Sequence, residues 1–463
     1  MKLNFFNFKE LNNRFLLTND FGKYVFLSKE QFYALMRKEI NIDSPLGKKL
    51  LQAKMIVDSS ELEYSSKNQY QLRDYKYYLC ESTSLHIFVV TTACNLGCVY
   101  CQANNGREQP HAFMTKEIAE KSVDIALQSP SKHLSFEFQG GEPLLNFDII
   151  KHIYEYSQSK NVNHQIDYNI VSNLTLLTED IAQYVAEHHI NISTSVDGDE
   201  CVHNGNRPFK NGIGSFEAVV ENIRCLQLKG MHVGAIQTTT KHSLLQPEKI
   251  VETYLNLGFD SIFVRPLTPL GKALAAWDEI GYTADEFVLF YKRMLLHIID
   301  ENKKGNYLRE EHAAMLLKKI SGCGLNYMEL RSPCGAGIGQ LAYFTDGNVF
   351  TCDEGRMLYE MGNDAFLLGN VFENDFSSII TGSTCRSVCA SSVLESIPSC
   401  CDCVYQPYCG TCPVVNFALY GDIIEKQPRE YKCRIYSGIF DEVFQILSSD
   451  DQKAIEILHS WSN

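Results

Sequence analysis

Short apolar runs alternate with amphipathic stretches between residue 86 and about residue 270. The runs have the length and composition of buried strands, which predicts strands at 86–92, 134–139, 165–171, 191–196, 232–239 and 261–267. Helical spacing of the apolar residues between them predicts helices at 115–129, 147–159, 178–188, 215–229 and 247–257. This alternation favours an α/β fold with a parallel sheet, either an open barrel or a doubly wound sheet.

The first 75 residues show a different pattern. Two short apolar runs, 14–18 and 23–28, predict strands joined by a turn. Ser28 and Gln31 form a capping box that predicts a helix directly after the second strand. A further amphipathic helix is predicted over 46–55. Two strands with short helices favour a winged-helix-like module over residues 1–75.

Basic residues outnumber acidic ones over residues 1–50, against the acidic balance of the whole chain. One interpretation is a packing domain with a solvated basic face. The other is a docking site for an acidic peptide that adds a strand to the edge of the hairpin. The pattern alone leaves both open.

The pattern of apolar and polar residues also divides the rest of the chain into segments. Residues 76–85 are polar and predict a linker. Residues 271–322 predict a helical connector, with helices over 284–299 and near 308–320. Residues 441–463 predict one C-terminal helix.

Composition narrows the possible functions. The chain has 463 residues, enough for two or three domains, and a formal net charge of −14. The acidic balance argues against nucleic acid or an anionic membrane as partner. No apolar stretch is long enough to span a membrane, and the first residues do not predict a signal peptide, so a cytoplasmic protein is expected. Clustered cysteines, 17 in all, then favour metal ligands over disulfides.

Three of these cysteines, Cys94, Cys98 and Cys101, directly follow the first predicted strand of the alternating region. A tetrahedral zinc site would need a fourth ligand, and the nearest other cysteines in the sequence are Cys80 and Cys201. On a four-iron four-sulfur cluster, three cysteines leave one iron without a protein ligand. Such an iron can bind a small molecule.

The next three strand ends carry further polar groups. Gly140, Gly141 and Glu142 follow the second strand, and Ser172 and Asn173 follow the third. Asp197 follows the fourth strand, with His203 and Arg207 shortly after it. Paired glycines let the backbone approach a ligand closely. Hydroxyl and carboxylate groups suit ribose hydroxyls or an amino group, and an arginine can pair with a carboxylate. Parallel strands bring their carboxyl ends to one edge, which predicts a site there.

The cysteine motif, the Gly-Gly-Glu-Pro motif and the Ser-Val-Asp-Gly motif together resemble those of radical S-adenosylmethionine (radical SAM) enzymes over residues 86–270. The resemblance implies a partial (β/α)6 barrel with a 4Fe–4S cluster on Cys94, Cys98 and Cys101. S-adenosylmethionine would bind the open iron and be cleaved reductively to a 5′-deoxyadenosyl radical, which abstracts a substrate hydrogen. The cofactor would do the hard chemistry, and the protein would orient it.

The resemblance also implies which residues contact S-adenosylmethionine. Its amino group would be bound by Gly140, Gly141 and Glu142, and its ribose by Ser172 and Asp197. Tyr100 would lie near the adenine, and Arg207 would pair with a carboxylate. This chain has Leu174 where the family more often has glycine. Because of this difference, the turn after the third predicted strand is not fixed by the resemblance.

A second group of cysteines comprises Cys334, Cys352, Cys400, Cys403, Cys409, Cys412 and Cys433. A zinc ribbon is one interpretation of its paired cysteines. The order and spacing also resemble the SPASM extension of radical SAM enzymes, over residues 323–440. The chain departs from that pattern at Cys409 and Cys412, which two residues separate instead of three.

The SPASM resemblance implies two auxiliary 4Fe–4S clusters. The first would be held by Cys334, Cys352 and Cys412, the second by Cys400, Cys403, Cys409 and Cys433. The first set lacks a fourth ligand, so either an iron is open or the ligand is one of Cys323, Cys385, Cys389 and Cys401. The remaining Cys80, Cys201 and Cys225 are expected to be small buried apolar residues.

Asp353 directly follows Cys352. In related sulfatase-maturating enzymes, an aspartate at this place is a candidate base. The alternative is a turn residue beside a cluster. A base must reach the proton that it removes, which a sequence does not show.

SPASM enzymes mostly modify peptides or proteins. Residues 1–75 resemble PqqD-like domains, which bind leader peptides, and residues 408–422 resemble the HxsB maturases of His-Xaa-Ser peptide systems. The implied activity is oxidative modification, chiefly cross-linking, of a ribosomally synthesised precursor peptide. Implied partners are that peptide, an electron donor such as flavodoxin or ferredoxin, and a second maturase. Alternatives are a sulfatase-maturating (formylglycine-forming) enzyme and a non-catalytic iron–sulfur carrier or peptide-binding scaffold.

Overall fold

The computed structural model describes residues 2–57, 64–79, 81–104, 111–322, 328–425 and 431–462. Within these residues, none of the helices combines the length and the apolar character that a membrane crossing requires.

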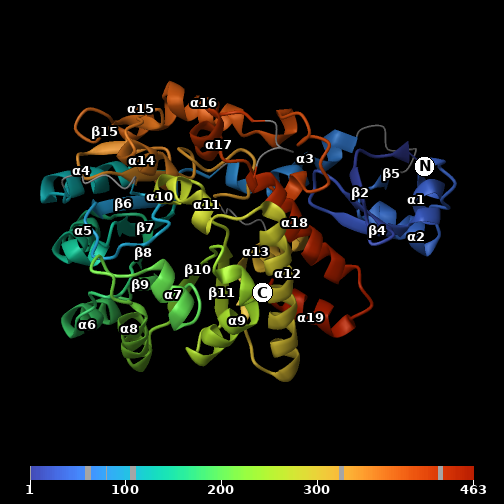
Figure 1. Cartoon of the computed structure of the whole chain (residues 1–463). Coiled ribbons are helices and arrows are strands. Elements are labelled where there is room, and N and C mark those ends of the chain that lie inside the picture. The colour runs from blue at the N-terminus through green and yellow to red at the C-terminus, as the bar shows by residue number, and fades with distance from the viewer. Residues whose placement is uncertain are drawn as a thin grey trace.

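The centre of the molecule is a sheet of ten strands (Figure 1). Its main part comprises β6 (Leu85–Thr91), β7 (His133–Gly140), β8 (Gln165–Val171), β9 (Asn191–Ser195), β10 (Val233–Thr238) and β11 (Ser261–Arg265). These six strands are parallel and lie in sequence order. A doubly wound sheet would reverse its order at a switch point, so the observed order is that of an open barrel. Each strand overlaps its predicted range, which confirms the strand predictions.

Helices cover the outer face of this sheet: α4 (Lys116–Ala126), α5 (Phe147–Lys160), α6 (Glu179–Glu187), α7 (Glu200–Asn206), α8 (Phe216–Leu228) and α9 (Pro247–Asn256). Alternate strand residues, such as Phe136 and Phe138, pack into the core on this side. Five of these helices were predicted. The short α7 was not, because its sequence shows no helical period.

The sheet continues into the cysteine-rich region. At one edge, β13 (Gln340–Tyr343) pairs in parallel with β6, and β14 (Asn348–Phe350) and β15 (Leu367–Asn370) follow as antiparallel strands. At the other edge, β12 (Arg309–Glu310) pairs with β11. Helices α14 (Asp353–Glu360), α15 (Phe376–Thr381), α16 (Ser383–Ser391) and α17 (Pro413–Tyr420) belong to the cysteine-rich region. The cysteine-rich region is therefore joined to the barrel by the β6–β13 pairing.

The connector is helical, as predicted, with α10 (Gly271–Ala275), α11 (Trp277–Ile280), α12 (Ala284–Lys304) and α13 (Glu311–Ser321). The prediction of one helix over 441–463 is wrong. The chain instead forms α18 (Tyr431–Leu447) and α19 (Gln452–Ser460). Asp451 caps α19 by accepting a hydrogen bond from the Ala454 amide, so a new helix starts there.

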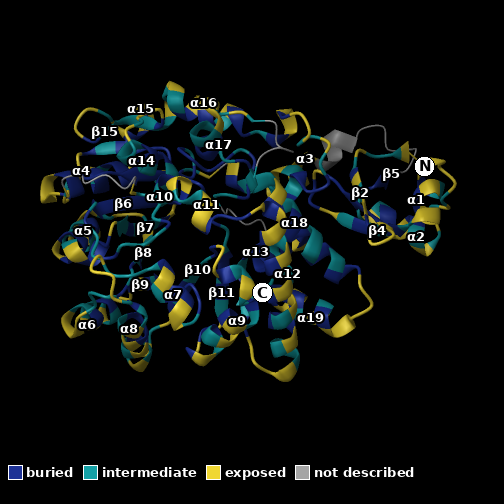
Figure 2. Cartoon of the chain, viewed as in Figure 1, coloured by how far each residue is buried: buried dark blue, intermediate teal, exposed yellow. Residues whose placement is uncertain are grey.

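The N-terminal unit contains a three-stranded antiparallel sheet of β2 (Asn7–Leu11), β3 (Arg14–Thr18) and β4 (Tyr24–Ser28). Strands β1 (Lys2–Leu3) and β5 (Ile56–Val57) form a second pair, and the helices are α1 (Lys29–Met36), α2 (Pro45–Gln52) and α3 (Tyr64–Tyr75). The capping box at the start of α1 is present as predicted. Figure 2 shows that α1 and α2 keep an exposed outer surface.

The prediction of a linker at 76–85 is wrong for the described residues. Tyr77–Leu79 form a 3-10 helix, and β6 already begins at residue 85. Tyr78 is buried, with the Arg331 guanidinium 4.5 Å above its ring. A cation against an aromatic face fixes this segment to the C-terminal region.

Candidate active site

The loop after β6 carries Cys94, Cys98 and Cys101, and neighbouring chain segments hold it in place. The Gly97 amide donates to the Pro208 carbonyl at 2.7 Å, and the Val99 amide donates to the Asn206 carbonyl at 3.0 Å. The loop is thereby attached to the segment that follows β9. All three cysteines are free thiols and partly exposed.

The three thiols are close enough to affect one another electrostatically. Burial raises the pKa of Cys94 to about 11 and that of Cys98 to about 12, and the neighbouring thiols act in the same direction. Thiols in this environment ionise readily only beside a cation such as a metal. The donor set therefore fits a soft metal or an iron–sulfur cluster.

Among the described residues, no three His, Cys, Asp or Glu side chains stand close enough together to enclose a single metal ion. A 4Fe–4S cluster binds each thiolate at a different iron, so its ligands need not converge on one point. The ligand role of the three cysteines stays a prediction.

The paired glycines after β7 lie against the end of β6. A Cβ on Gly141 would stand 2.2 Å from the Ala93 carbonyl oxygen, and one on Gly140 would stand 2.1 Å from the Thr91 oxygen. Only glycine fits at these distances. The Glu142 amide donates to the Ala93 carbonyl at 2.7 Å, so the Gly-Gly-Glu segment sets the start of the cysteine loop.

Glu142 joins the ends of β7 and β8. Its carboxylate accepts hydrogen bonds from the Ser172 hydroxyl and the Asn173 amide, both at 2.7 Å, and from the Leu144 amide at 3.0 Å. Burial raises the pKa of Glu142 to about 7, although these hydrogen bonds work against the shift. The structure thus brings two predicted cofactor residues, Glu142 and Ser172, together with each other.

The turn after β8 differs from the commoner glycine turn without losing its shape. Leu174 has φ of +60°, in the left-handed region, and its side chain is fully buried in the core. Left-handed backbone costs a non-glycine residue roughly 1–2 kcal/mol, and burying a leucine side chain contributes a similar or larger amount. Leu174 therefore keeps the turn that a glycine would make.

Asn173 connects this turn to the cysteine loop. Its amide donates to the Asn95 side-chain oxygen at 3.0 Å and approaches the Cys94 sulfur at 3.9 Å. The sequence placed Asn173 at a strand end, where its amide suits ribose hydroxyls or an amino group, and indicated no contact with the cysteine loop. The structure places it among the groups that position Cys94.

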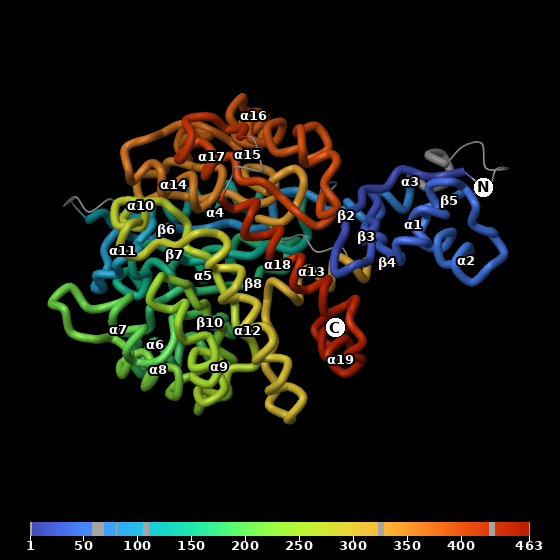
Figure 3. The backbone as a smooth tube through the Cα atoms, turned by 45° about the vertical axis from the view of Figure 1, so that its right-hand side comes forward, coloured from blue at the N-terminus to red at the C-terminus, as the bar shows by residue number. Residues whose placement is uncertain are grey.

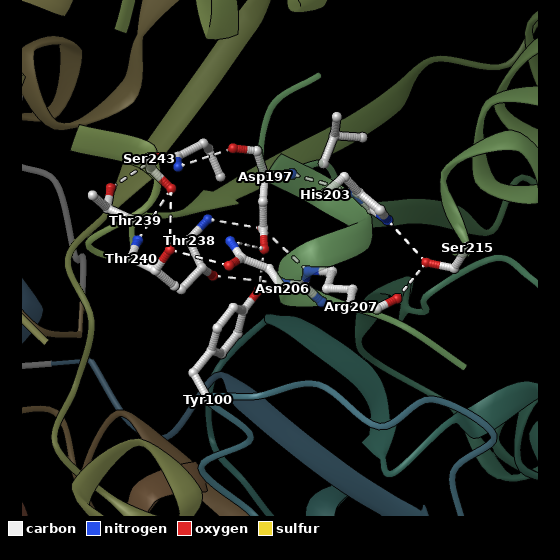
Figure 4. Close-up of polar contacts among 12 residues, drawn as sticks. Tyr100, Asp197, His203, Asn206, Arg207, Ser215, Thr238, Thr239, Thr240 and Ser243 are labelled. Carbon is white, nitrogen blue, oxygen red and sulfur yellow. Dashed lines mark hydrogen bonds and ion pairs between the residues drawn. The ribbon is translucent and has the colours of Figure 1, made fainter. Parts of the chain in front are cut away.

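Asp197 lies at the centre of a second buried network, at the ends of β9 and β10 (Figure 4). Its carboxylate accepts from the Tyr100 hydroxyl at 2.6 Å and the Asn206 amide at 3.1 Å, and it pairs with Arg207 Nε at 3.1 Å. The Arg207 guanidinium also stands 5.1 Å above the Tyr100 ring. Tyr100, Asp197 and Arg207 therefore contact one another, and Arg207 already has a carboxylate partner.

His203 supports the same network as a neutral side chain. Burial lowers the pKa of His203 to about 4. Its Nε2 lies 3.1 Å from the Ser215 hydroxyl, and the Asp197 amide points to its Nδ1 at 3.4 Å (Figure 4). Because Tyr100 belongs to the cysteine motif, the network connects that loop to two further strand ends.

The second group of cysteines divides spatially into the two sets that the SPASM resemblance implies. The thiols of Cys334, Cys352 and Cys412 act on one another, and burial raises the pKa of Cys334 to about 11 and of Cys412 to about 12. The Cys409 thiol is instead affected by those of Cys400, Cys403 and Cys433. We call these the first and second auxiliary sets.

The cysteines without an assigned role are distributed differently. Cys385 and Cys389 lie one turn apart on α16 and hydrogen-bond to each other. Cys80 and Cys323 lie outside the described residues. The expectation that Cys201 and Cys225 are buried is wrong, since Cys201 is exposed and Cys225 is partly exposed. Both lie on helices of the outer layer, where a side chain can face solvent.

Asp353 begins α14, where Arg356 Nε donates to it at 2.7 Å. Arg356 is buried and also donates to Glu360 at 2.6 Å. Asp353 is therefore held in an ion pair. Its role as a base stays a prediction.

A cluster of charges between the barrel and the C-terminal region was not found from the sequence. Arg265 at the end of β11 pairs with Glu329 at 2.5 Å, and the Tyr436 hydroxyl donates to Glu329 at 2.9 Å. Although burial opposes it, Arg265 and Lys432 hold the pKa of Glu329 well below its usual range. These residues have no shared motif or spacing that could have revealed them.

Residues 88–254 match the family model of the radical SAM superfamily. An uncharacterized protein of Methanocaldococcus jannaschii, MJ0907, is 34% identical over 186 residues, which is 40% of this chain and 63% of that protein. The cysteine-type anaerobic sulfatase-maturating enzyme of Clostridium perfringens is 25% identical over 300 residues, covering 62% of this chain and 77% of that enzyme.

Two solved structures share the fold at low identity. Native anSMEcpe with bound AdoMet superposes with a TM-score of 0.68 at 20% identity, over 82% of this chain and 99% of that one. Streptococcus suis SuiB bound to precursor peptide SuiA gives a TM-score of 0.54 at 15% identity, over 91% of this chain and 97% of that one. The architecture of this chain is thus that of SPASM-type neighbours, which confirms the predicted fold class.

Proposed function

We propose that the chain is a radical SAM oxidoreductase that modifies a ribosomally synthesised precursor peptide, and the match of residues 88–254 to the radical SAM superfamily model supports this. The observation that carries the proposal is the meeting of three cysteines with two buried polar networks at one edge of the parallel sheet. Carboxyl ends of parallel strands are where barrel enzymes place their reacting groups.

The superfamily cofactors are S-adenosylmethionine and a 4Fe–4S cluster, and Cys94, Cys98 and Cys101 would hold the cluster. When bound, they supply a 5′-deoxyadenosyl radical that abstracts a hydrogen atom from the substrate. Three free thiols in one short loop fit this group.

The role of the surrounding residues is to fix the geometry of that loop. Glu142 and Asn173 join it to the ends of β7 and β8, and Asp197 joins it through Tyr100 to β9 and β10. Groups held in place before reaction need no reorganisation during it. Ser172 and Arg207 help to hold Glu142 and Asp197, and we propose that the cofactor binds beside these networks.

The two auxiliary sets provide ligands for further clusters. Removal of a hydrogen atom leaves a substrate radical, and a net oxidation then requires an electron acceptor. Cys334, Cys352 and Cys412 would hold one auxiliary 4Fe–4S cluster, and Cys400, Cys403, Cys409 and Cys433 the other. A flavodoxin or ferredoxin would supply the electron that starts the reaction.

The N-terminal unit offers a surface for a peptide. Phe5, Phe8, Tyr33 and Met36 are all between 44% and 55% exposed. Phe8 belongs to β2, an edge strand of the unit's sheet, and its ring lies 4.9 Å from that of Phe32. Exposed aromatic side chains beside an edge strand suit an extended peptide that adds a strand. We place the precursor peptide, of His-Xaa-Ser type, at this edge, with a second maturase as a further partner.

A second candidate function is formylglycine formation on a sulfatase. The similarity to a sulfatase-maturating enzyme favours it, because it extends over 62% of this chain. Asp353 would then be the candidate base, and its hydrogen bond from Arg356 would fix the position of its carboxylate.

One assay separates the two functions. The reconstituted protein is incubated with S-adenosylmethionine, dithionite and either a peptide with His-Xaa-Ser repeats or a sulfatase peptide with a central cysteine or serine. We expect 5′-deoxyadenosine together with loss of two hydrogen atoms from the His-Xaa-Ser peptide. Turnover of the sulfatase peptide alone would overturn the proposal in favour of the second candidate.

A further inference from the structure

The N-terminal sheet is covered on both faces. In β3, Phe15 and Leu17 pack into the unit's own core, while Leu16 packs into the core of the main body. In β4, Tyr24 and Phe26 likewise lie against Phe444 of α18, with ring centroids 5.4 and 6.2 Å apart. Figures 1 and 3 both show the unit beside the C-terminal segment. The unit is therefore packed onto the body.

The part of the body beneath this sheet carries the second auxiliary set. Asn7 on β2 is buried, and its side-chain amide donates to the carbonyls of Cys401 and Cys403, both at 3.0 Å. The Asn7 side-chain amide thus holds together two carbonyl groups of the turn that carries Cys400 and Cys403. A turn held in this way keeps the two thiols at a fixed separation.

Three further hydrogen bonds hold the same loop from the N-terminal side. The Thr18 hydroxyl donates to the Val404 carbonyl at 2.6 Å, and Tyr408 donates to the Gly22 carbonyl at 2.9 Å. The Tyr75 hydroxyl donates to the Pro407 carbonyl at 2.8 Å. The segment from residue 401 to residue 408 is thus bound along its length by the first 75 residues.

Lys9 brings a positive charge to this site. Its Nζ pairs with Asp441 of α18 at 2.6 Å and lies 5.2 Å from the centroid of the Tyr405 ring. Burial raises the pKa of the Cys403 thiol, and the Lys9 ammonium acts against that shift. Lys9 is therefore near enough to stabilise negative charge on Cys403.

We propose that Asn7 and Lys9 are positioning residues of the second auxiliary iron–sulfur site, so that the N-terminal unit forms one wall of that site as well as a peptide-docking surface. The inference rests on the auxiliary-cluster assignment of the proposed function. Strand β2 carries both roles, because Phe8 lies half-exposed on the opposite face, beside Phe32, while Asn7 and Lys9 point to the cluster loop.

This arrangement has a direct electrostatic consequence. A reduced cluster carries one more negative charge than an oxidised one, so a nearby cation favours the reduced form. Loss of Lys9 would also leave Asp441 without its cation. Both effects lower the reduction potential of the second auxiliary cluster.

The test uses the full chain in which Cys94, Cys98 and Cys101 are alanine, so that bound iron belongs to the auxiliary sets. Midpoint potentials are measured by redox titration with electron paramagnetic resonance detection. Lys9→Met should lower the potential of one auxiliary cluster, and Lys9→Arg should restore it. Lys48→Met, the same change on an exposed face of α2, should leave the potential as in the parent. Asn7→Ala should increase the fraction of auxiliary iron lost to a chelator.

Equal potentials in Lys9→Met and Lys48→Met, with auxiliary iron retained, would overturn the inference and leave the proposed function intact. A parent protein that binds no auxiliary iron would instead overturn the cluster assignment, and the inference with it. Iron content and potential are read without turnover, so neither result depends on the peptide.

Discussion

The first cysteine loop and the second auxiliary set are held in different ways. Cys94, Cys98 and Cys101 lie in one short loop, which is held by the ends of consecutive strands through Glu142 and Asp197. The cysteines of the second set come from the separate segments 400–409 and 433, and the N-terminal unit closes over the first of these. The proposed reaction site is thus built by the barrel, whereas the proposed auxiliary site depends on contacts between distant parts of the chain.

This difference suits the proposed roles of the two sites. A reaction site must stay open to substrate, and its three cysteines are partly exposed. A cluster that only transfers electrons needs surroundings that do not change, because solvent exposure and nearby charges set its reduction potential.

Replacing Cys94, Cys98 and Cys101 together with alanine should abolish reductive cleavage of S-adenosylmethionine. Iron should fall by about a third, from roughly twelve atoms to roughly eight, because each cubane holds four. Cleavage is measured as 5′-deoxyadenosine under dithionite. The matched control replaces Cys201 and Cys225, which lie outside both sites, and should change neither quantity. A loss of all iron in the triple variant would show that the two regions are not independent.

Asp197→Asn should destabilise the barrel more than any other single change proposed here. It leaves the buried Arg207 guanidinium without its carboxylate, and breaking a buried pair in this way costs about 3–5 kcal/mol. The free energy of unfolding in urea measures the effect. The control is Asp260→Asn, whose partner His232 is exposed, and it should cost under about 1 kcal/mol. Similar losses in both variants would mean that the Asp197 network does not stabilise the barrel.

Glu142 should make stability depend on pH. Its folded pKa of about 7 lies above the usual value of 4.5, so the folded state binds the proton more tightly than the unfolded state. Stability should therefore fall as pH rises from about 4.5 through 7, by up to about 3 kcal/mol. Glu142→Gln carries no titrating group and should remove this part of the pH profile. Identical unfolding profiles for both proteins between these pH values would contradict the shift.

Much of the barrel could be predicted because its signals are local. Strand and helix periods appear within each element, and the capping box at Ser28 and Gln31 needs only four consecutive residues. The spacing of Cys94, Cys98 and Cys101 likewise identified their loop. The sequence also showed that Leu174 occupies a position where glycine is commoner. It did not show that the leucine side chain is buried in the core, which offsets the cost of its left-handed backbone.

What could not be predicted arises from contacts between distant residues. Strand β2 was not among the two strands predicted for this unit, and its Asn7 and Lys9 face the body of the protein. Arg265 and Glu329 are brought together only by folding, with no pattern in their spacing. The wall of the second auxiliary set is missing from the sequence analysis for the same reason.

Gly141→Ala tests whether the strand ends position the first loop. The added Cβ would stand 2.2 Å from the Ala93 oxygen, so the loop before Cys94 must shift. Overpacking of this kind costs about 1–3 kcal/mol, and we expect slower cleavage of S-adenosylmethionine with auxiliary iron unchanged. The matched control is Gly205→Ala, where a Cβ would meet nothing within 4 Å. Wild-type cleavage by Gly141→Ala would show that the loop tolerates displacement.

Tyr408→Phe tests the other side of the contrast. The change removes one buried hydroxyl and leaves the Gly22 carbonyl without that donor, at a cost of about 1–3 kcal/mol. Because the bond joins the N-terminal unit to the second auxiliary set, chelators should remove auxiliary iron faster, while cleavage of S-adenosylmethionine stays unchanged. Tyr70→Phe, on an exposed side chain of α3, is the control and should behave as wild type. Slower cleavage with unchanged iron retention would contradict the division between the two sites, because a contact at the auxiliary wall would then act on the barrel.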